Sequence, residues 1–363
     1  MDQVRERFQN LHEFISVARD NLSRNYWDYL VGGSETETTL RRNRQALDSI
    51  AFRPRILRDV STTDTSGTFL GRKLKLPVAL APIGSIERFS PGGCADVADA
   101  AGHFGVAMYQ SSVAKPEVEE TGKHSPESLK IFQLYVRGDH AWVEAFLDRA
   151  VASGFGALCL TVDTHHYSRR ERDIAKRFRA ASARSIEQSS HQMQLDWAQM
   201  DKLRKRYKVP LIVKGVATAE DAKLCIEHGI DVIHVSNHGG RQLDHGLGAI
   251  ETLPEIVAEV KGRAQIIIDG GFVRGTDIVK AIALGATAVC IGRLYCLGLA
   301  AAGRDGVERV LEILQDEIEC CLSLLGVNRL DELNPSYLRA AAPVTQPHVF
   351  SAFPFADAPN NRY

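Results

Sequence analysis

The residues best suited to chemistry lie in the stretch DVIHVSNHGGRQLD at residues 231–244. A short β-branched run ends there in a polar turn that contains His238 and Arg241. Gly239 and Gly240 permit a sharp turn that residues with a Cβ would resist. A histidine can act as a general base near neutral pH and an arginine is a fixed cation, so this turn predicts a site for an acidic substrate. A lone histidine would more often have a structural role in a hydrogen-bonded loop, but its neighbours here favour chemistry.

The elements that must position this turn follow a regular rhythm in which short apolar runs alternate with helical stretches. The eight predicted strands are residues 78–81, 106–110, 130–136, 157–162, 211–213, 231–235, 265–268 and 288–291. Helix candidates between them are residues 95–104, 142–153, 219–228, 250–260 and 275–284. Alternation that closes after eight strands predicts an α/β fold of the (β/α)₈ barrel type. A doubly wound open sheet is the alternative, but no G-x-G-x-x-G motif follows the first strand.

An N-terminal helical extension precedes the barrel. Residues 12–31 have helical periodicity and end in two glycines, and residues 35–49 form a second, polar helical pattern. A small hairpin is predicted at residues 70–74. We expect a single domain over residues 1–363, in which residues 1–55 are the helical segment, 56–340 the barrel and 341–363 a tail.

Two segments depart from the repeat. The connection after the fourth strand, residues 164–209, is longer than a usual crossover, and its small, polar middle at residues 180–190 predicts a mobile lid. Residues 340–363 are rich in Ala, Pro and Asn and are expected to be extended or disordered.

Composition excludes several classes of protein. The chain has 363 residues and a formal net charge of -1, which argues against a general binder of nucleic acid or anionic membrane. No apolar run approaches the roughly 20 residues of a membrane span, and the N-terminus does not read as a signal peptide. The 7 cysteines lack C-x-x-C spacing and lie mostly in apolar contexts, which predicts reduced thiols in a cytoplasmic protein.

In a barrel of this kind the C-terminal ends of the strands face one mouth. These ends carry many polar and glycine residues: Pro82, Ile83 and Gly84; Ser111; Gln133 and Tyr135; Thr161 and Asp163, followed by Arg170; Lys214; Ser236 and His238; Asp269, Gly270 and Gly271; and Gly292 and Arg293. Such a set predicts a large, polar, anion-binding ligand. The glycine turns after strands seven and eight offer free backbone N–H groups, and phosphate sites of barrels commonly form there. Each glycine pair alone could be a simple turn, but together with Lys214 they favour flavin mononucleotide (FMN), whose anionic reduced ring a lysine would stabilise.

The chain resembles the FMN-dependent α-hydroxy-acid oxidases and dehydrogenases, which include glycolate oxidase, lactate monooxygenase and mandelate dehydrogenase. The resemblance covers about residues 10–340, and its most specific motif is SNHGGRQLD at residues 236–244. Supporting motifs are FQLYV at 132–136, LTVDT at 160–164, RRERDI at 169–174, VKGV at 213–216, DGG at 269–271, IGR at 291–293 and FRPRIL at 52–57.

The resemblance implies oxidation of an (S)-2-hydroxy acid to the 2-oxo acid. His238 would take the hydroxyl proton while hydride passes from Cα to flavin N5; in an older carbanion scheme it would take the Cα proton instead, and the sequence does not separate the two. Asp163 would hold the imidazole and stabilise its protonated form. Arg241 and Arg170 would clamp the substrate carboxylate, because a guanidinium can bind it through two hydrogen bonds.

The family pattern also implies that Tyr29 and Tyr135 donate hydroxyl hydrogen bonds to the substrate. Flavin contacts would come from Pro82, Ile83, Gly84, Ser111, Gln133, Thr161, Lys214, Ser236, Asp269, Gly270, Gly271, Gly292 and Arg293. No metal is implied.

Several positions depart from the family pattern. Gly84 stands where alanine is common, which in the family weakly favours dehydrogenases and the monooxygenase over fast oxidases. Val273 replaces a phosphate-binding arginine, so Arg293 would carry more of that charge, with Arg274 nearby. Val113 replaces an aromatic pocket residue, and residues 163–167 read DTHHY in place of the usual Asp-Thr-Pro segment. Of these, the adjacent histidines favour a packing or pocket-wall role over a metal site.

Other functions remain open at the level of sequence. An FMN-dependent barrel isomerase of the type 2 isopentenyl diphosphate isomerase kind is the alternative enzyme, although the arginine pair suits it less well. A flavoprotein that has lost catalysis is disfavoured by the complete set of site residues. The electron acceptor could be oxygen, a quinone or a carrier protein, and the family implies a homo-oligomer, often a tetramer.

Overall fold

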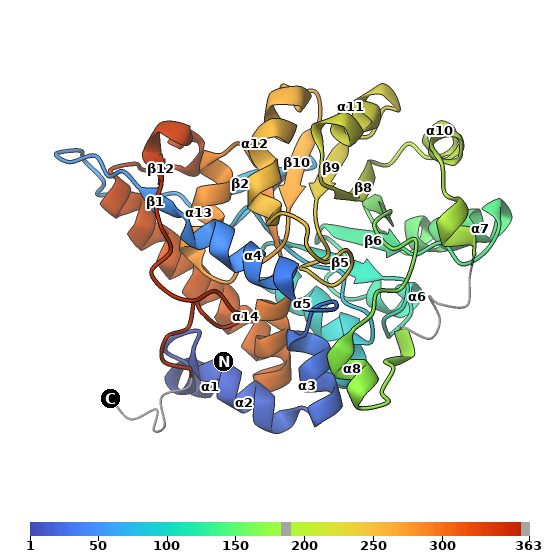
Figure 1. Cartoon of the computed structure of the whole chain (residues 1–363), viewed down its shortest axis with the longest axis horizontal. Coiled ribbons are helices and arrows are strands. Elements are labelled where there is room, and N and C mark those ends of the chain that lie inside the picture. Colours follow the sequence, from blue (N-terminus) through green and yellow to red (C-terminus); the bar gives the residue numbers. More distant parts are fainter. Residues whose placement is uncertain (183–189, 357–363) are drawn as a thin grey trace.

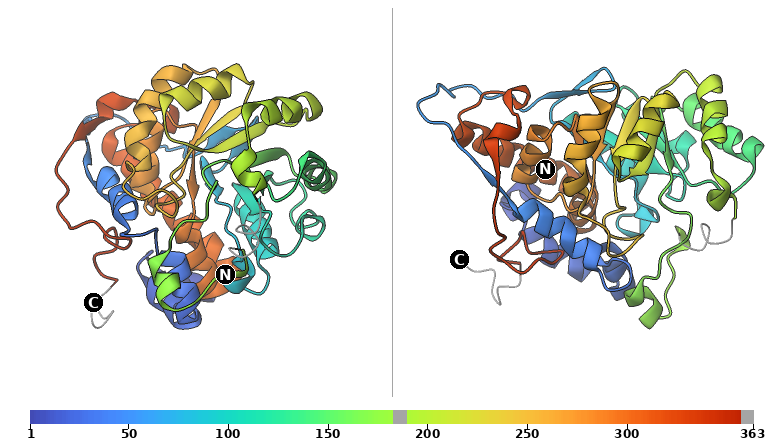
Figure 2. Two further views of the ribbon diagram at one scale, coloured as in Figure 1. Left: turned by 45° about the vertical axis from the view of Figure 1, so that its right-hand side comes forward. Right: turned by 45° about the horizontal axis from the view of Figure 1, so that its top comes forward.

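The structure is a computed structural model that describes residues 1–182 and 190–356. Eight parallel strands form a closed barrel in the order β10-β11-β4-β5-β6-β7-β8-β9, with helices around it (Figures 1 and 2). The strands are β4 (Val78–Leu80), β5 (Ala107–Ser111), β6 (Lys130–Leu134), β7 (Ala157–Thr161), β8 (Leu211–Val216), β9 (Val232–Val235), β10 (Gln265–Ile268) and β11 (Ala288–Ile291). The predicted (β/α)₈ barrel and all eight of its strands are confirmed, with small shifts at the ends.

The barrel strands form because they are almost wholly apolar and can be buried on both faces. Every residue of β5, β6 and β7 is buried. A charged side chain within a strand is buried with it and is stabilised by hydrogen bonds. At the start of β6 the Nζ of Lys130 donates to the carbonyls of His124 and Ser125, in the loop that precedes the strand.

The predicted helices of the outer layer are all present. They are α5 (Cys94–Phe104), α7 (His140–Ala152), α11 (Ala219–Glu227), α12 (Ala249–Val260) and α13 (Gly275–Ala283). A long helix, α14 (Arg293–Leu325), follows the last strand and is not among the helices that the periodicity predicts; it bends at Ala302 and Gly303, where φ of Gly303 is +60°. Shorter helical elements are α6 (Val118–Thr121), η1 (Ile86–Arg88), η3 (Leu330–Glu332) and η4 (Pro335–Tyr337).

The N-terminal extension differs from the prediction in one respect. It comprises α1 (Asp2–Arg7), α2 (Glu13–Asn21), α3 (Arg24–Val31) and α4 (Thr38–Asp48), of which α2 and α3 lie beside α14 in Figure 1. Residues 12–31, predicted as one helical stretch, form two helices because Leu22 is extended and the Ser23 side chain caps α3 by accepting from the backbone N–H of Tyr26. A serine cap satisfies a backbone N–H that the new helix would otherwise leave free.

Two small sheets lie outside the barrel. The hairpin predicted at residues 70–74 is confirmed as β2 (Gly67–Phe69) paired with β3 (Arg72–Leu74). Strand β1 (Ile50–Phe52) pairs antiparallel with β12 (Leu338–Ala340), so the segment that enters the barrel is joined to the segment that leaves it.

The long connection after β7 contains α8 (Glu171–Ala175), η2 (His191–Gln194) and α10 (Trp197–Arg206). The predicted lid at residues 180–190 falls mostly on residues 183–189, which lie outside the described part of the chain. Of its described residues, Ala180 and Ser182 are buried.

The predicted tail has no helix or strand between residues 341 and 356, as expected of an extended segment. It is nevertheless packed, because Phe353 is buried and the ring of Phe350 stacks on Trp27 at 5.7 Å. Residues 357–363 lie outside the described residues.

Two further observations bear on the class of protein. Among the helices of residues 1–182 and 190–356, none is long and apolar enough to cross a membrane. All 7 cysteines are free, and only Cys320 is exposed.

Candidate active site

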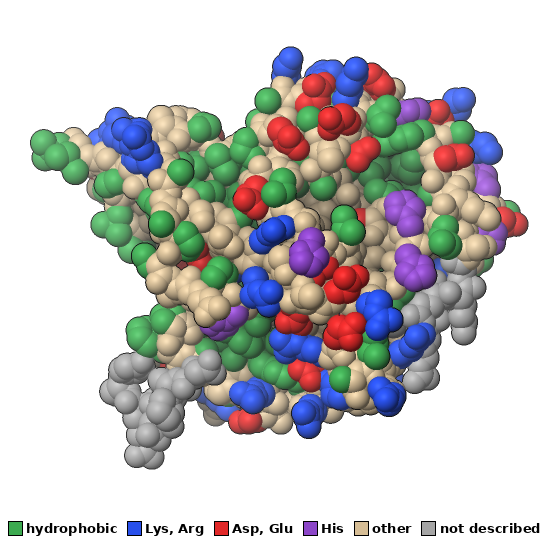
Figure 3. All heavy atoms as spheres, in the orientation of Figure 1, with side chains coloured by type: hydrophobic (Ala, Val, Ile, Leu, Met, Phe, Trp, Pro, Cys, Tyr) green, Lys and Arg blue, Asp and Glu red, His purple; other side chains and the backbone are tan. Residues whose placement is uncertain are grey.

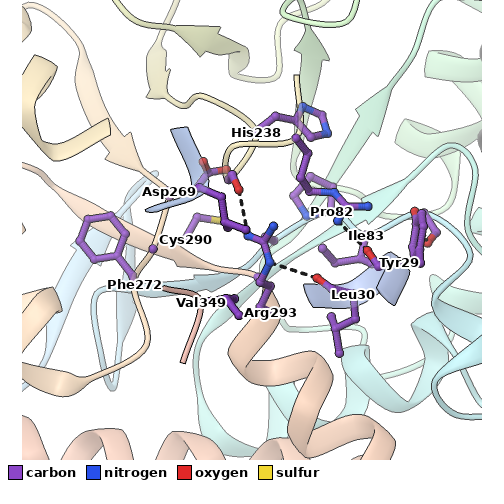
Figure 4. A pocket seen from close by; sticks show the side chains of 18 of the residues that line it. Tyr29, Leu30, Pro82, Ile83, His238, Asp269, Phe272, Cys290, Arg293 and Val349 are labelled. Atoms are coloured by element: carbon purple, nitrogen blue, oxygen red, sulfur yellow. Dashed lines mark hydrogen bonds between the residues drawn. The ribbon is translucent and has the colours of Figure 1, made fainter. Parts of the chain in front are cut away.

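A cavity with about 1150 Å³ of empty space, the solvent at its mouth included, opens at the C-terminal ends of the barrel strands. Fourteen of the predicted site residues line it: Tyr29, Pro82, Ile83, Gly84, Tyr135, Arg170, Lys214, His238, Arg241, Asp269, Gly270, Gly271, Gly292 and Arg293. The predicted residues Ser111, Gln133, Thr161, Asp163 and Ser236 are not among its lining residues. Figure 4 shows several of them converging on one space, with His238 and Arg293 at different sides. The structure therefore brings together residues that are up to 264 positions apart in sequence, from Tyr29 to Arg293.

His238 lies at the mouth of the barrel between a carboxylate and a phenol. Its Nδ1 is 3.0 Å from Asp163 Oδ1, and its Nε2 is 3.3 Å from the hydroxyl of Tyr135. The backbone φ of His238 is +56°, and its backbone N–H donates to Ser236 Oγ, which holds the turn in this conformation. The carboxylate fixes the Nδ1–H tautomer and leaves Nε2 facing the cavity as a base.

The environment of this pair sets its protonation. Burial lowers the pKa of His238, although Asp163 acts in the opposite direction. Burial opposes ionisation of Asp163, but the His238 imidazole and the Lys214 ammonium outweigh it, and the pKa of Asp163 lies below its ordinary value. A neutral imidazole beside a carboxylate is the state that a general base requires before it accepts a proton.

Gly215 allows Asp163 to reach this position. Strand β8 has a register irregularity between Lys214 and Val216, and φ of Gly215 is +115°. A Cβ at Gly215 would lie 2.7 Å from Cβ of Asp163, which no side chain could accommodate. The bulge and the glycine together make room for the carboxylate behind His238.

Two arginines meet above the ring of Tyr29. Arg241 lies 4.8 Å and Arg170 lies 5.8 Å from that ring, and Arg170 also lies 4.4 Å from the ring of Tyr167. Arg241 donates to the carbonyls of Tyr29 and Gly32, whereas Nε of Arg170 is buried without a hydrogen-bond partner in the part of the chain that the structure describes. Burial lowers the pKa of Arg241, and the neighbouring Arg170 lowers it further. Two adjacent guanidiniums with unused donors form a site for an anion such as a carboxylate.

A second polar network lies deeper, at the end of β8 and β10. The ammonium of Lys214 is 2.6 Å from Ser236 Oγ and 2.9 Å from Asp269 Oδ2, and Ser236 Oγ donates to Asp269 Oδ1. Burial opposes the charge on Lys214, but Asp269 and Asp163 outweigh it and raise its pKa. Lys214 is therefore a permanent buried cation at the floor of the cavity.

Several buried polar atoms around this floor have no partner. Among the described residues, the amide of Gln133 and the hydroxyl of Thr161 make no side-chain hydrogen bond. They belong to neighbouring strands, where Ser111 pairs with Gln133 and Thr161 pairs with Lys214 in the strand register. Unsatisfied buried polar groups are rare in folded proteins, so these side chains are arranged for a polar ligand such as the heteroatom edge of a flavin ring.

The other end of the cavity has the predicted glycine turns. Gly270 and Gly271 have φ of +112° and +87°, and Gly292 precedes the first turn of α14. The Arg293 guanidinium donates to the carbonyls of Leu30, Gly32 and Gly239, two of which lie in the N-terminal extension (Figure 4 labels Leu30). Burial lowers the pKa of Arg293.

Arg274, predicted near the phosphate, is directed elsewhere: it pairs with Glu317 Oε1 at 2.5 Å and does not line the cavity. Val273 does line the cavity, so an apolar side chain faces the region where the family pattern has a cation.

The structure adds residues that the strand-end pattern does not reveal. Ser182 lies 3.3 Å from the Tyr29 hydroxyl, and Phe89 and Val349 also line the cavity. Nothing in the local sequence of these residues signals a site, because they reach the cavity through loops far from the barrel strands. His234 Nε2 lies 3.2 Å from Asp269 Oδ2. This residue could have been recognised from the sequence, because it is the one polar residue of the apolar strand β9.

Comparisons with known proteins agree with this geometry. The family model described as FMN-dependent dehydrogenase matches residues 18–340. The glycolate oxidase of Spinacia oleracea is 39% identical in a match 353 positions long that covers 91% of this chain and 95% of that protein. An L-lactate oxidase of Nostoc sp. is 37% identical in a match 355 positions long that covers 91% of this chain and 97% of that protein.

Solved structures give the same result. A mandelate oxidase with (S)-2-phenylpropionate superposes with a TM-score of 0.86 at 35% identity, over 93% of this chain and 100% of that one. A soluble mutant of the membrane-associated (S)-mandelate dehydrogenase of Pseudomonas putida superposes with a TM-score of 0.86 at 32% identity, over 91% of this chain and 99% of that one.

The barrel and its strand-end cavity, taken with these sequence and structure matches, place the chain among the flavin-dependent oxidoreductases. The chain belongs to the FMN-dependent dehydrogenase family, and FMN is its cofactor. The predicted family resemblance and cofactor are thereby confirmed.

Proposed function

We propose that this protein oxidises an (S)-2-hydroxy acid to the 2-oxo acid, with His238 as the base. The observation that carries the proposal is the pairing of His238 Nδ1 with Asp163 at 3.0 Å, which leaves Nε2, beside the Tyr135 hydroxyl, as the nitrogen that can accept a proton in a cavity that also contains two arginines. The matched glycolate and L-lactate oxidases support a 2-hydroxy-acid substrate. FMN, when bound, supplies the acceptor for the two electrons and the hydrogen removed from Cα.

The chain's own residues would hold the substrate and move its proton. Arg170 and Arg241 would bind the carboxylate, and the hydroxyls of Tyr29 and Tyr135 would donate to it and to the substrate oxygen. The substrate hydroxyl would then lie within reach of His238 Nε2. Asp163 would stabilise the imidazolium that forms when the proton arrives, because a carboxylate at this distance favours the charged ring.

The floor of the cavity would hold FMN. The side chains of Gln133, Thr161, Ser111 and Ser236 would bond the polar edge of the ring, and Lys214 would stabilise negative charge there. Pro82, Ile83 and Gly84 would pack against the ring. Asp269, Gly270, Gly271, Gly292 and Arg293 would bind the ribityl and phosphate end. Arg293 donates to three backbone carbonyls and has two further N–H groups that could bind a phosphate oxygen.

The isomerase alternative is not favoured. An isoprenoid diphosphate needs a larger anion clamp, whereas Arg170 and Arg241 converge on one tyrosine ring and fit a single carboxylate. The electron acceptor remains one of three: oxygen, a quinone or a carrier protein.

The test is anaerobic reduction of the FMN-bound protein by a panel of aliphatic and aromatic 2-hydroxy acids, followed by visible absorbance. The wild-type flavin should bleach with the (S) enantiomer of at least one acid, and His238→Ala should keep the flavin colour but lose the bleaching. Normal bleaching of the His238→Ala variant would refute the assignment of the base.

We further propose a homo-oligomer, of which a tetramer is the form that the family suggests. The segment that follows β1 projects from the body of the molecule (Figure 1), and in this segment Ile56 and Leu57 are 82% and 100% exposed. Figure 3 shows hydrophobic side chains at the end of this projection with Lys and Arg side chains next to them. Exposed apolar side chains of this size commonly mark an interface. Sedimentation analysis should find an assembly that Leu57→Asp weakens, and a monomeric wild type would contradict the proposal.

We also propose that residues 1–363 form one FMN-binding domain located in the cytoplasm. The β1–β12 pair and the contacts of Arg241 and Arg293 with the N-terminal extension support one domain. Free cysteines persist in a reducing compartment, which supports the cytoplasm. A single cooperative unfolding transition would support one domain, and cell fractionation would test the cytoplasmic location.

A further inference from the structure

The segment after β12 (Leu338–Ala340) forms part of the cavity at the barrel mouth, although it follows the barrel in sequence. Val349 lines this cavity together with Gly292 and Arg293. Figure 4 draws Val349 and Arg293 at the same end of the cavity, and Figure 1 shows the segment running from β12 toward the N-terminal helices. Residues 344–356, named here the C-terminal segment, therefore supply part of the wall beside the proposed phosphate end of FMN.

A second cavity lies on the other side of this wall. It has about 1300 Å³ of empty space, the solvent at its mouth included, and it lies between the C-terminal segment and helices α2, α3 and α4. Leu40 of α4 and Val349 line both cavities. These two apolar side chains therefore separate the cavity at the barrel mouth from a second opening to solvent, and of the two only Leu40 belongs to a helix.

Aromatic side chains hold the C-terminal segment on the body of the protein. The ring of Phe350 stacks on Trp27 at 5.7 Å, and Phe353 is buried with its ring 5.6 Å from that of His12. Among the described residues, the hydrogen bonds of residues 348–353 join residues of the segment itself. A stretch that a few side chains hold, without backbone pairing to the body, opens at a lower cost in free energy than a barrel strand does.

The same end of the cavity has little free charge with which to retain an anion. Val273 contributes an apolar side chain to its lining. Arg44 also lines the cavity, but each of its three guanidinium nitrogens already donates to a carboxylate, and one donates to a backbone carbonyl as well. Arg293 is left as the cation for the phosphate, so enclosure of this end contributes more to holding the cofactor than charge alone would.

We propose that the C-terminal segment is a gate for FMN, which closes the phosphate end of the site and must leave the body of the protein before the cofactor exchanges. The proposal rests on the proposed placement of the phosphate beside Arg293. When the segment is displaced, Val349 leaves the wall, the two cavities join, and the phosphate end gains a path to solvent. The rate of FMN dissociation should therefore follow the opening of the segment and not the stability of the barrel.

The experiment measures the rate of FMN dissociation from the FMN-bound protein, without substrate, by the rise in flavin fluorescence after dilution. Phe353→Ala removes the buried ring that holds the segment, and Phe350→Ala removes the ring that stacks on Trp27. We expect Phe353→Ala to raise the rate at least about tenfold, because loss of a buried phenylalanine costs more free energy than a tenfold change requires. Phe350→Ala, at a half-buried position, should raise it at least about threefold. Hydrogen exchange of residues 344–356 should become faster in both variants.

Phe104→Ala is the matched control. Phe104 is a buried phenylalanine at the end of α5, and it lines neither cavity. Its truncation lowers the stability of the protein without loosening the C-terminal segment, so the rate of FMN dissociation should stay within about twofold of the wild type. If Phe353→Ala does not yield a folded, FMN-bound protein, Phe350→Ala decides by the same comparison.

A wild-type rate of FMN dissociation in both segment variants would overturn the proposal. With faster hydrogen exchange of the segment, that result would mean that FMN leaves by the barrel mouth; without it, the two rings would not hold the segment. An equal increase in Phe104→Ala would also overturn the proposal, because lost stability would then explain the effect. A failure of the proposed oxidation is distinct, since no 2-hydroxy acid enters this experiment.

Discussion

Replacement of Asp163 by asparagine tests how much the buried carboxylate contributes to proton transfer. Asp163 Oδ1 lies 3.0 Å from His238 Nδ1, and its second oxygen is buried without a hydrogen-bond partner among residues 1–182 and 190–356. Two unit charges about 4 Å apart interact by about 4 kcal/mol at an effective dielectric constant near 20. Each ~1.4 kcal/mol changes a rate tenfold, so loss of the full interaction would slow flavin reduction about 1000-fold. Because the proton is only partly transferred in the transition state, we expect the rate of flavin reduction to fall between about 100-fold and about 1000-fold.

The assay is the rate of anaerobic flavin bleaching by a saturating 2-hydroxy acid in a stopped-flow instrument. The dissociation constant of FMN should change little, because Asp163 faces the histidine and not the floor of the cavity. Glu308→Gln is a suitable control, since Glu308 forms a similar carboxylate–histidine contact with His103 at 2.6 Å but does not line the cavity. A reduction rate of Asp163→Asn within about tenfold of the wild type would show that the carboxylate does not stabilise the imidazolium.

Three further predictions concern the same cavity. Arg170→Met should weaken binding of the substrate analogue oxalate at least about thirtyfold, a loss of about 2 kcal/mol, while FMN binding stays unchanged; an unaltered inhibition constant would contradict the carboxylate clamp. Because burial lowers the pKa of His238, kcat/KM should be lost only as the pH falls below about 6.5, where the base becomes protonated, and an acid limb centred above about pH 7 would contradict this sign. Val113→Trp should decrease kcat/KM for aromatic 2-hydroxy acids at least about tenfold more than for the smallest acids, because Val113 lines the cavity next to Gly84; equal effects on both would show that this wall does not contact the substrate side chain.

Much of the barrel could be predicted because its strands are short apolar runs at regular spacing, and the position of each strand end fixes which residues face the mouth. His238, Lys214 and Asp269 were found in this way, and the structure brings them into one cavity. Tyr29 was found only through the family resemblance, since it lies on a helix outside the repeat.

The remaining features depend on contacts between distant segments. The break between α2 and α3 depends on a single serine cap. The residues on both sides of it have helical periodicity, so the sequence pattern predicts one continuous helix. The three carbonyls on Arg293 and the position of Ser182 beside Tyr29 arise from tertiary packing of loops, for which the local sequence carries no pattern. The predicted role of Arg274 was wrong because Glu317, 43 positions away on α14, binds its guanidinium.

The carbonyls that receive Arg241 and Arg293 have a consequence for chimeric proteins. The guanidiniums of Arg241 and Arg293 both donate to the carbonyl of Gly32, the residue that follows α3 (Arg24–Val31). The end of α3 therefore helps to hold the two arginines of the active site in place. A hybrid that joins the first segment of one relative to the barrel of another must preserve this junction, or Arg241 and Arg293 will lose the carbonyl acceptors that the N-terminal extension supplies. Recombination points should therefore keep the early helices and the barrel mouth from the same parent.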